Sequence, residues 1–108
     1  MRIAVLLLVV FSTASFANDY QPRAGANGAE IYAQACAACH GADGSGKFSL
    51  FFDLTSSTLL AGEMKDVIQK GGFIMPSFAN IKGAELDALV TYVRSLGPLI
   101  AKVQQTGN

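Results

Sequence analysis

Two cysteines and one histidine form a tight group in the first half of this 108-residue chain. Cys36 and Cys39 are separated by two alanines, and His40 follows directly. This Cys-x-x-Cys-His spacing is typical of the attachment of a c-type haem. Each thiol can add to one vinyl group of the same haem, and the adjacent imidazole can turn under the iron. We therefore predict thioether bonds at Cys36 and Cys39 and an axial iron ligand at His40.

Three other uses of these residues compete with haem attachment. A structural zinc site needs about four ligands, whereas the chain has two cysteines and one histidine in total. A thioredoxin-like redox pair needs βαβ surroundings, and the sequence shows no such pattern. A disulfide between Cys36 and Cys39 is the remaining alternative.

The second axial ligand is expected to be a methionine, because His40 is the only histidine. Met64 shares an apolar helix face, where a methionine usually serves packing. Met75 lies in a loop and precedes Pro76, which favours an extended, stiff approach. We therefore predict Met75 as the ligand, with ordinary loop packing as its alternative. A Met/His pair leaves no open position on the iron, which favours one-electron transfer over substrate chemistry.

The N-terminus has the features of a cleaved signal peptide, predicted over residues 1–17. Arg2 precedes an unbroken apolar run over residues 3–11, and small residues at Ser15 and Ala17 suit a signal peptidase. An uncleaved membrane anchor is the alternative, but the run is shorter than the roughly 18–20 residues that span a bilayer. We expect export to the periplasm, without a stable membrane anchor.

The charged side chains balance, with eight basic and eight acidic residues. A net charge near zero excludes the basic footprint of a nucleic-acid-binding domain. It also gives little reason to expect strong electrostatic steering towards a partner. The expected partners are redox proteins, and the sequence identifies neither the donor nor the acceptor.

Apolar residues recur at helical spacing in three segments, and no β-strand pattern or internal repeat is found. The expected helices cover residues 27–36, 59 or 60 to 70, and 83–96. Asn27 is the expected N-cap of the first helix, with Glu30 placed as in a capping box. Glycines follow the other two helices, and Gly71 suits a left-handed C-terminal position. We predict one all-α domain over residues 27–97, preceded by an extended leader (18–26) and followed by a tail (98–108).

Two loops are expected to form the pocket between these helices. Residues 41–46 are rich in glycine and should let the backbone pass close to a flat ligand. They lack the full spacing of a phosphate-binding loop, and no strand precedes them. The apolar residues of the segment 47–57, including Phe52 and Leu54, are expected to pack against a haem face.

Four segments of the chain together resemble a small bacterial class I c-type cytochrome with a single haem. They are Gly28-Ala-Glu-Ile-Tyr32, Cys36-Ala-Ala-Cys-His-Gly41, Met75-Pro-Ser-Phe78 and Leu89-Val-Thr-Tyr-Val-Arg-Ser-Leu96. The resemblance implies a cytochrome c fold, with three main helices and loops wrapped around one covalently bound haem c. It also implies that the first and last helices cross near Gly28, Tyr32 and Tyr92.

One departure from the family pattern concerns the partner of the proximal histidine. Members usually carry a proline whose carbonyl accepts the histidine Nδ1–H bond, but this chain has no proline between His40 and Pro76. The corresponding place is expected within residues 51–53, where any residue can present a carbonyl oxygen.

The leading functional hypothesis is a soluble periplasmic one-electron carrier that is not an enzyme. It would shuttle electrons from a dehydrogenase or quinol-oxidising complex to a terminal oxidase or reductase. One alternative is the small cytochrome subunit of a larger periplasmic dehydrogenase. The other is a haem peroxidase or gas-binding protein with an open iron site.

Overall fold

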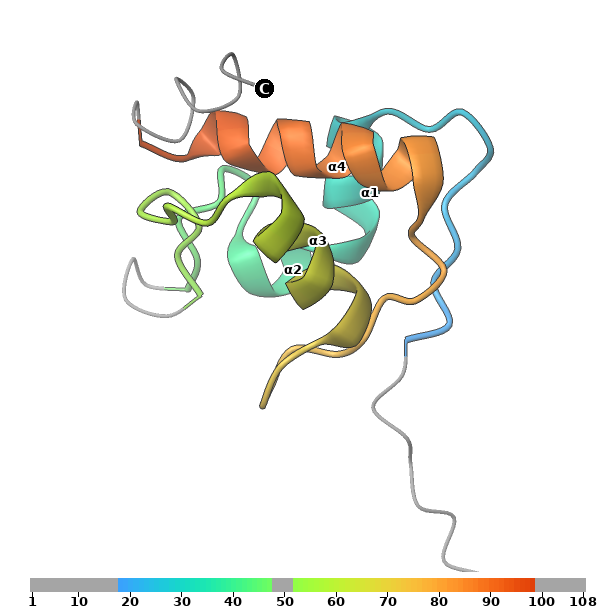
Figure 1. The fold of residues 1–108 in the computed structure, drawn as a ribbon. Helices are drawn as coiled ribbons and strands as arrows, with labels where there is room; N and C mark the ends of the chain where they lie inside the picture. Colours follow the sequence, from blue (N-terminus) through green and yellow to red (C-terminus); the bar gives the residue numbers. More distant parts are fainter. Residues whose placement is uncertain (1–17, 48–51, 99–108) are drawn as a thin grey trace, which may run out of the picture.

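The computed structural model describes residues 18–47 and 52–98 (Figure 1). The predicted signal peptide (1–17), the loop residues 48–51 and residues 99–108 of the tail lie outside the described residues. The described ranges contain four helices and no strand: α1 (Gly28–Ala35), α2 (Ala37–His40), α3 (Ala61–Lys70) and α4 (Gly83–Leu96). The all-α prediction is confirmed, and three of these helices match the expected ones within about two residues at each end.

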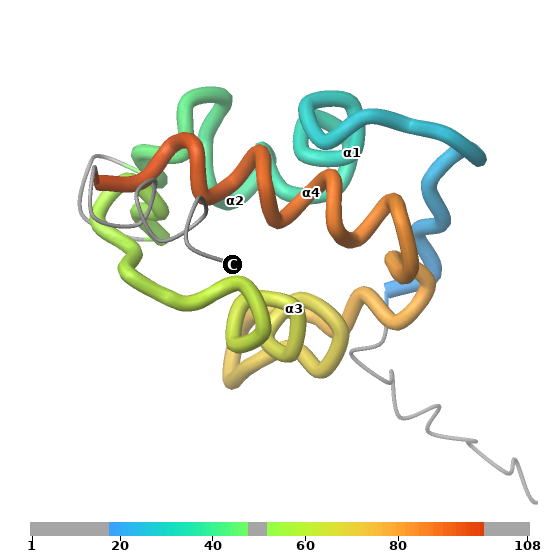
Figure 2. The backbone as a smooth tube through the Cα atoms, turned by 45° about the horizontal axis from the view of Figure 1, so that its top comes forward, coloured from blue at the N-terminus to red at the C-terminus, as the bar shows by residue number. Residues whose placement is uncertain are grey.

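Helix α4 lies between α1 on one side and α3 on the other (Figure 2). The approach to α1 is close because Gly28 has no side chain. A Cβ atom there would lie 2.2 Å from the carbonyl oxygen of Ala88 and 2.7 Å from Cβ of Tyr92. The rings of Tyr32 and Tyr92 meet at the same crossing, with centroids 5.3 Å apart. The crossing implied by the family resemblance is therefore present.

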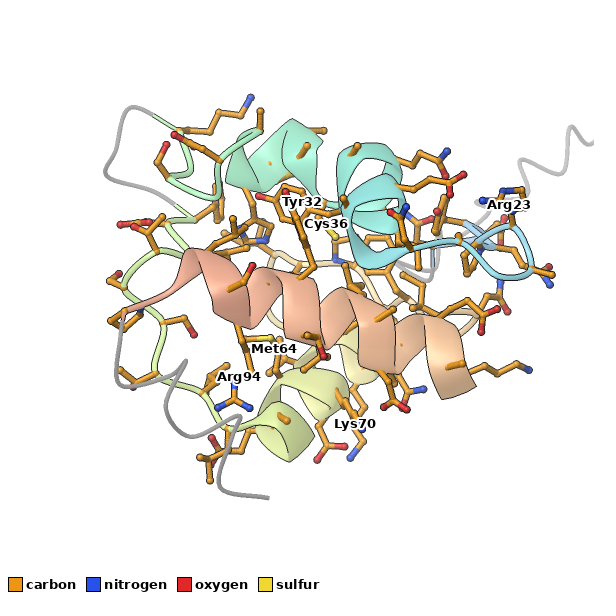
Figure 3. The ribbon with its side chains drawn as sticks, turned by 90° about the horizontal axis from the view of Figure 1, so that it is seen from above. Arg23, Tyr32, Cys36, Met64, Lys70 and Arg94 are labelled. Carbon is orange, nitrogen blue, oxygen red and sulfur yellow. The ribbon has the colours of Figure 1, made fainter. Side chains whose placement is uncertain are left out.

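Helix α3 closes the opposite side of the core. Met64 and Ile68 are the buried residues of α3, and Figure 3 shows Met64 on the α3 side of α4, away from Tyr32 and Cys36. An ion pair between Lys65 and Asp87, 2.5 Å long, joins the two helices at their surface. The packing role weighed for Met64 agrees with this position.

The helix ends follow the sequence signals. The Asn27 side chain accepts a hydrogen bond from the Glu30 amide at 2.8 Å, as an N-cap should. The Glu30 carboxylate itself pairs with Arg23 at 2.8 Å. Gly71 ends α3 with a φ of 73°, in the left-handed region that glycine reaches without steric cost.

Candidate functional site

A cavity of about 440 Å³ contains all four predicted site residues in its wall: Cys36, Cys39, His40 and Met75. The first three come from the α1–α2 junction, and Met75 comes from the loop after α3. Met75 therefore meets the cysteine motif at one site, although it lies 35 positions beyond His40 in the chain. Met64, the other methionine weighed as a ligand, belongs to the core cluster and not to this wall.

A short helix that the sequence did not indicate presents the cysteine motif. Helix α1 ends at Ala35, and α2 begins after a bend at Cys36. The carbonyl of Cys36 accepts hydrogen bonds from the amides of Cys39 (3.2 Å) and His40 (3.0 Å). One helical turn places residues i, i+3 and i+4 on the same face. Cys36, Cys39 and His40 accordingly line the same cavity.

The two cysteines are free thiols in the structure, Cys36 half-buried and Cys39 exposed. Burial, with a smaller contribution from Cys39, raises the pKa of the Cys36 thiol to about 11. Reactive cysteines of Cys-x-x-Cys redox proteins have the opposite property, a lowered pKa. This environment disfavours a thioredoxin-like use of the pair.

The imidazole of His40 is oriented by a backbone carbonyl. Its Nδ1 atom lies 2.6 Å from the carbonyl oxygen of Phe52. Because a carbonyl only accepts, Nδ1 carries the proton and Nε2 is free to bind a metal. Phe52 lies within the expected segment 51–53 and adopts a φ of 62°. Its ring also lines the cavity and meets the His40 ring edge-on, at 6.2 Å between centroids.

The glycine-rich turn connects the Phe52 loop to the helical core. Residues 41–46 do not line the cavity. Gly44 instead lies under the end of α4, where a Cβ atom would come 3.0 Å from Cδ1 of Leu96. Its carbonyl accepts a 2.7 Å bond from the Leu54 amide, and the Gly41 carbonyl accepts a 2.6 Å bond from the Tyr32 hydroxyl. The turn therefore anchors the Phe52 loop to the helical core.

The loop that carries Met75 is fastened to the end of α3. The Met75 carbonyl accepts a hydrogen bond from the Gly72 amide at 2.9 Å, and the Phe78 amide donates to the Ile68 carbonyl at 2.9 Å. A Cβ atom on Gly71 would lie 2.7 Å from the Met75 carbonyl oxygen. These contacts hold the backbone of Met75, itself half-buried, at the cavity wall.

The cavity wall includes residues that sequence reasoning did not assign to the site, among them Asn18, Tyr20 and Gln34. The Tyr20 hydroxyl donates to Oε1 of Gln34 at 2.8 Å, so the leader contacts α1 beside the cysteine motif. No hydrophobic periodicity marks the leader, and a contact across 14 positions leaves no pattern in a single sequence.

The donor set fits a haem better than a bare metal ion. Within the described ranges, no group of three or more His, Cys, Asp or Glu side chains could hold an ion. Two thiols, one imidazole and one thioether instead suit a macrocycle that brings its own iron. Most of the remaining lining residues are apolar, including Ile74, Pro76 and Phe78.

Comparison with known proteins gives one family. A family model described as cytochrome C oxidase, cbb3-type, subunit III matches residues 23–93. The matched range contains the cysteine motif, Met75 and most of α4. The comparisons with curated proteins and with solved structures found no match.

Proposed function

Because the chain belongs to this family of c-type cytochrome domains, we propose that it is a periplasmic one-electron carrier with His40 and Met75 as axial ligands. Its cofactor is a covalently bound haem c, and its general role is haem-based electron transfer. When bound, the haem supplies an iron that accepts and releases single electrons. We assign the thioether bonds to Cys36 and Cys39.

The observation that carries this proposal is the meeting of the four residues at one cavity. His40 presents Nε2 because its Nδ1–H donates a hydrogen bond to the Phe52 carbonyl. Met75 presents a thioether from the separate loop after α3. A thioether ligand would raise the reduction potential, and with both axial positions filled no position would remain for a substrate. These properties suit a carrier and not an enzyme.

The periplasmic location is supported by the N-terminal sequence. The apolar run over residues 3–11 and the small residues at 15 and 17 fit a cleaved export signal. Among the described residues, no helix has the length and apolar character needed to cross a membrane. Mass spectrometry of the secreted protein tests this assignment, and we expect a chain beginning at Asn18.

A second candidate function is that of a cytochrome subunit docked in a larger redox complex. The matching family is described as a subunit of an oxidase, and a dehydrogenase is the other host considered. Phe73 is fully exposed and Ile74 is 68% exposed, next to Met75 in sequence. Apolar side chains in this position suit contact with a protein. Native gel filtration distinguishes a free carrier from a docked subunit, because the haem absorbance of a free carrier elutes at the size of a small monomer.

The ligand assignment is tested by Met75→Ala, with Met64→Leu as the matched control in the core. We expect Met75→Ala to keep its covalent haem, to lose the weak near-infrared sulfur-to-iron band and to have a lower potential. It should also bind carbon monoxide when reduced. Met64→Leu should retain the band and the potential. An unchanged band and potential in Met75→Ala would refute the assignment.

A further inference from the structure

The leader packs along the cavity. Asn18 and Tyr20 are both half-buried and both line the wall. The Asn18 side chain accepts a 2.8 Å hydrogen bond from the Tyr20 amide, which closes a local turn. The backbone nitrogen of Asn18 donates to the Ser77 carbonyl at 2.8 Å, two residues beyond Met75. In a chain that begins at Asn18 this donor is the α-amino group. The leader therefore contacts the loop that bears the proposed second ligand.

The other end of the same segment contacts α1. The Tyr20 ring packs against the core cluster, and its hydroxyl donates to Gln34 at 2.8 Å. Gln34 lies two residues before Cys36. Helices α1 and α3 pack against α4, so the two walls of the cavity belong to different parts of the fold. Residues 18–20 connect these walls directly.

We propose that Asn18 and Tyr20 form a clamp that positions the Met75 loop against the haem. This inference rests on the proposed axial role of Met75. The leader clamp, defined as residues 18–20, joins the cysteine wall at Gln34 to the Met75 wall at Ser77. Both residues are positioning residues, because they act on the ligand loop and provide no iron ligand themselves.

The physical effect of the clamp follows from the ligand it supports. A neutral thioether can be displaced from iron when its loop moves away. Each contact made only when the loop is closed lowers the fraction of molecules with Met75 dissociated. The Asn18 side chain acts through the turn that it closes with the Tyr20 amide, because this turn places the Asn18 backbone nitrogen against Ser77. Loss of one ordinary hydrogen bond changes such an equilibrium about five-fold. Tyr20 contributes more through its ring, because the partly buried ring packs against the core cluster and an alanine would lose this contact.

The test measures how readily imidazole replaces Met75 in the ferric protein. Imidazole binds only when the sixth position opens, so its apparent affinity reports the open fraction. We expect Asn18→Ala to raise the affinity about five-fold and Tyr20→Ala about ten-fold or more. Every variant is first checked by mass for haem attachment and for a chain beginning at the residue in position 18.

Three matched variants separate positioning from general destabilisation. Asn18→Asp keeps the side-chain acceptor, Tyr20→Phe keeps the ring, and Asp19→Asn changes an exposed residue between the two. We expect Asn18→Asp and Asp19→Asn to stay within about two-fold of the wild type. Tyr20→Phe loses the bond to Gln34 but keeps the ring, so it should raise the affinity by about five-fold at most and less than Tyr20→Ala does. The near-infrared sulfur-to-iron band should weaken most in the two alanine variants.

The outcomes also separate the clamp from the proposed ligation. If Met75→Ala binds imidazole far more tightly than the wild type while Asn18→Ala and Tyr20→Ala do not, the clamp is refuted and the ligation stands. If Met75→Ala binds imidazole with wild-type affinity, the axial role of Met75 is refuted and the clamp falls with it. The clamp is supported if Asn18→Ala has an effect that Asn18→Asp does not share, and if Tyr20→Phe has a smaller effect than Tyr20→Ala.

Discussion

The Nδ1 atom of His40 lies 2.6 Å from the carbonyl oxygen of Phe52, a residue with a φ of 62°. A left-handed conformation costs a residue with a side chain roughly 1–2 kcal/mol. The strain lies at the residue that orients the predicted iron ligand. The chain thus keeps the carbonyl–histidine bond of the family without the usual proline, through an unusual backbone conformation.

A proline at position 52 is expected to destabilise the fold. Proline fixes φ near −65° and cannot adopt the conformation of Phe52. We expect Phe52→Pro to lower the free energy of unfolding by more than about 1 kcal/mol. It should also raise the reduction potential, because the Nδ1–H bond increases the basicity of the imidazole. Urea unfolding and redox titration of the holoprotein measure both effects.

Phe52→Asn is the control for this prediction, since asparagine tolerates a positive φ. It also removes the ring, so its difference from the wild type reports the ring's packing in the cavity wall. A proline variant with the same stability and potential as the asparagine variant would show that the backbone conformation is unimportant.

The crossing of α1 and α4 depends on the missing side chain at Gly28. A Cβ atom would lie 2.2 Å from the Ala88 carbonyl oxygen, which is backbone and cannot rotate away. We expect Gly28→Ala to destabilise the holoprotein by about 3 kcal/mol, at the upper end of overpacking effects. Gly62→Ala is the matched control, because Gly62 lies within α3 and its Cβ would meet no atom within 4 Å. The free energy of unfolding of Gly62→Ala should rise by about 0.5–1 kcal/mol. If urea unfolding gave the same change in the free energy of unfolding for Gly28→Ala and Gly62→Ala, the close-contact explanation would be contradicted.

Local patterns in the sequence located the main helices, whereas contacts between distant residues determined much of the site. Periodicity and end signals gave α4 as residues 83–96, the same bounds as in the structure. The extra helix α2 is only four residues long, too short for a periodic signal. The family pattern placed the carbonyl that orients His40 within residues 51–53. The positive φ of Phe52, in contrast, is a consequence of tertiary structure. The proposed leader clamp depends on contacts of Tyr20 with Gln34 and of Asn18 with Ser77, which no local pattern encodes.

Ionisation of Tyr32 should weaken the fold in strongly alkaline solution. Its ring is buried and its hydroxyl donates to the Gly41 carbonyl at 2.6 Å. Burial above all, with nearby acidic groups, raises the pKa of Tyr32 from 10.0 to about 12. A folded-state pKa above the unfolded value gives stability that is complete below pH 10 and is lost as the pH rises towards 12.

Tyr32→Phe isolates this contribution. At pH 7 the variant should be about 1 kcal/mol less stable than the wild type, because the Gly41 carbonyl loses its donor. Above pH 10 the difference should shrink, since phenylalanine does not ionise. Urea unfolding of the two holoproteins at pH 7, 10 and 11.5 measures the difference. A constant gap across this range would mean that Tyr32 ionises equally in both states.

Prevention of haem attachment should largely unfold the chain. The cavity of about 440 Å³ lies between the α1–α2 wall and the Met75 wall, and Ala35, Cys36 and Met75 join the core at its border. Without the haem these apolar walls face water, and a domain of this size has little other core to compensate. We expect the double variant Cys36→Ala, Cys39→Ala to lose more than about half of its far-ultraviolet helical signal. Ala33→Ser, an exposed change on α1, should keep both haem and helicity. A fully helical haem-free variant with a cooperative unfolding transition would show that the polypeptide alone supports this fold.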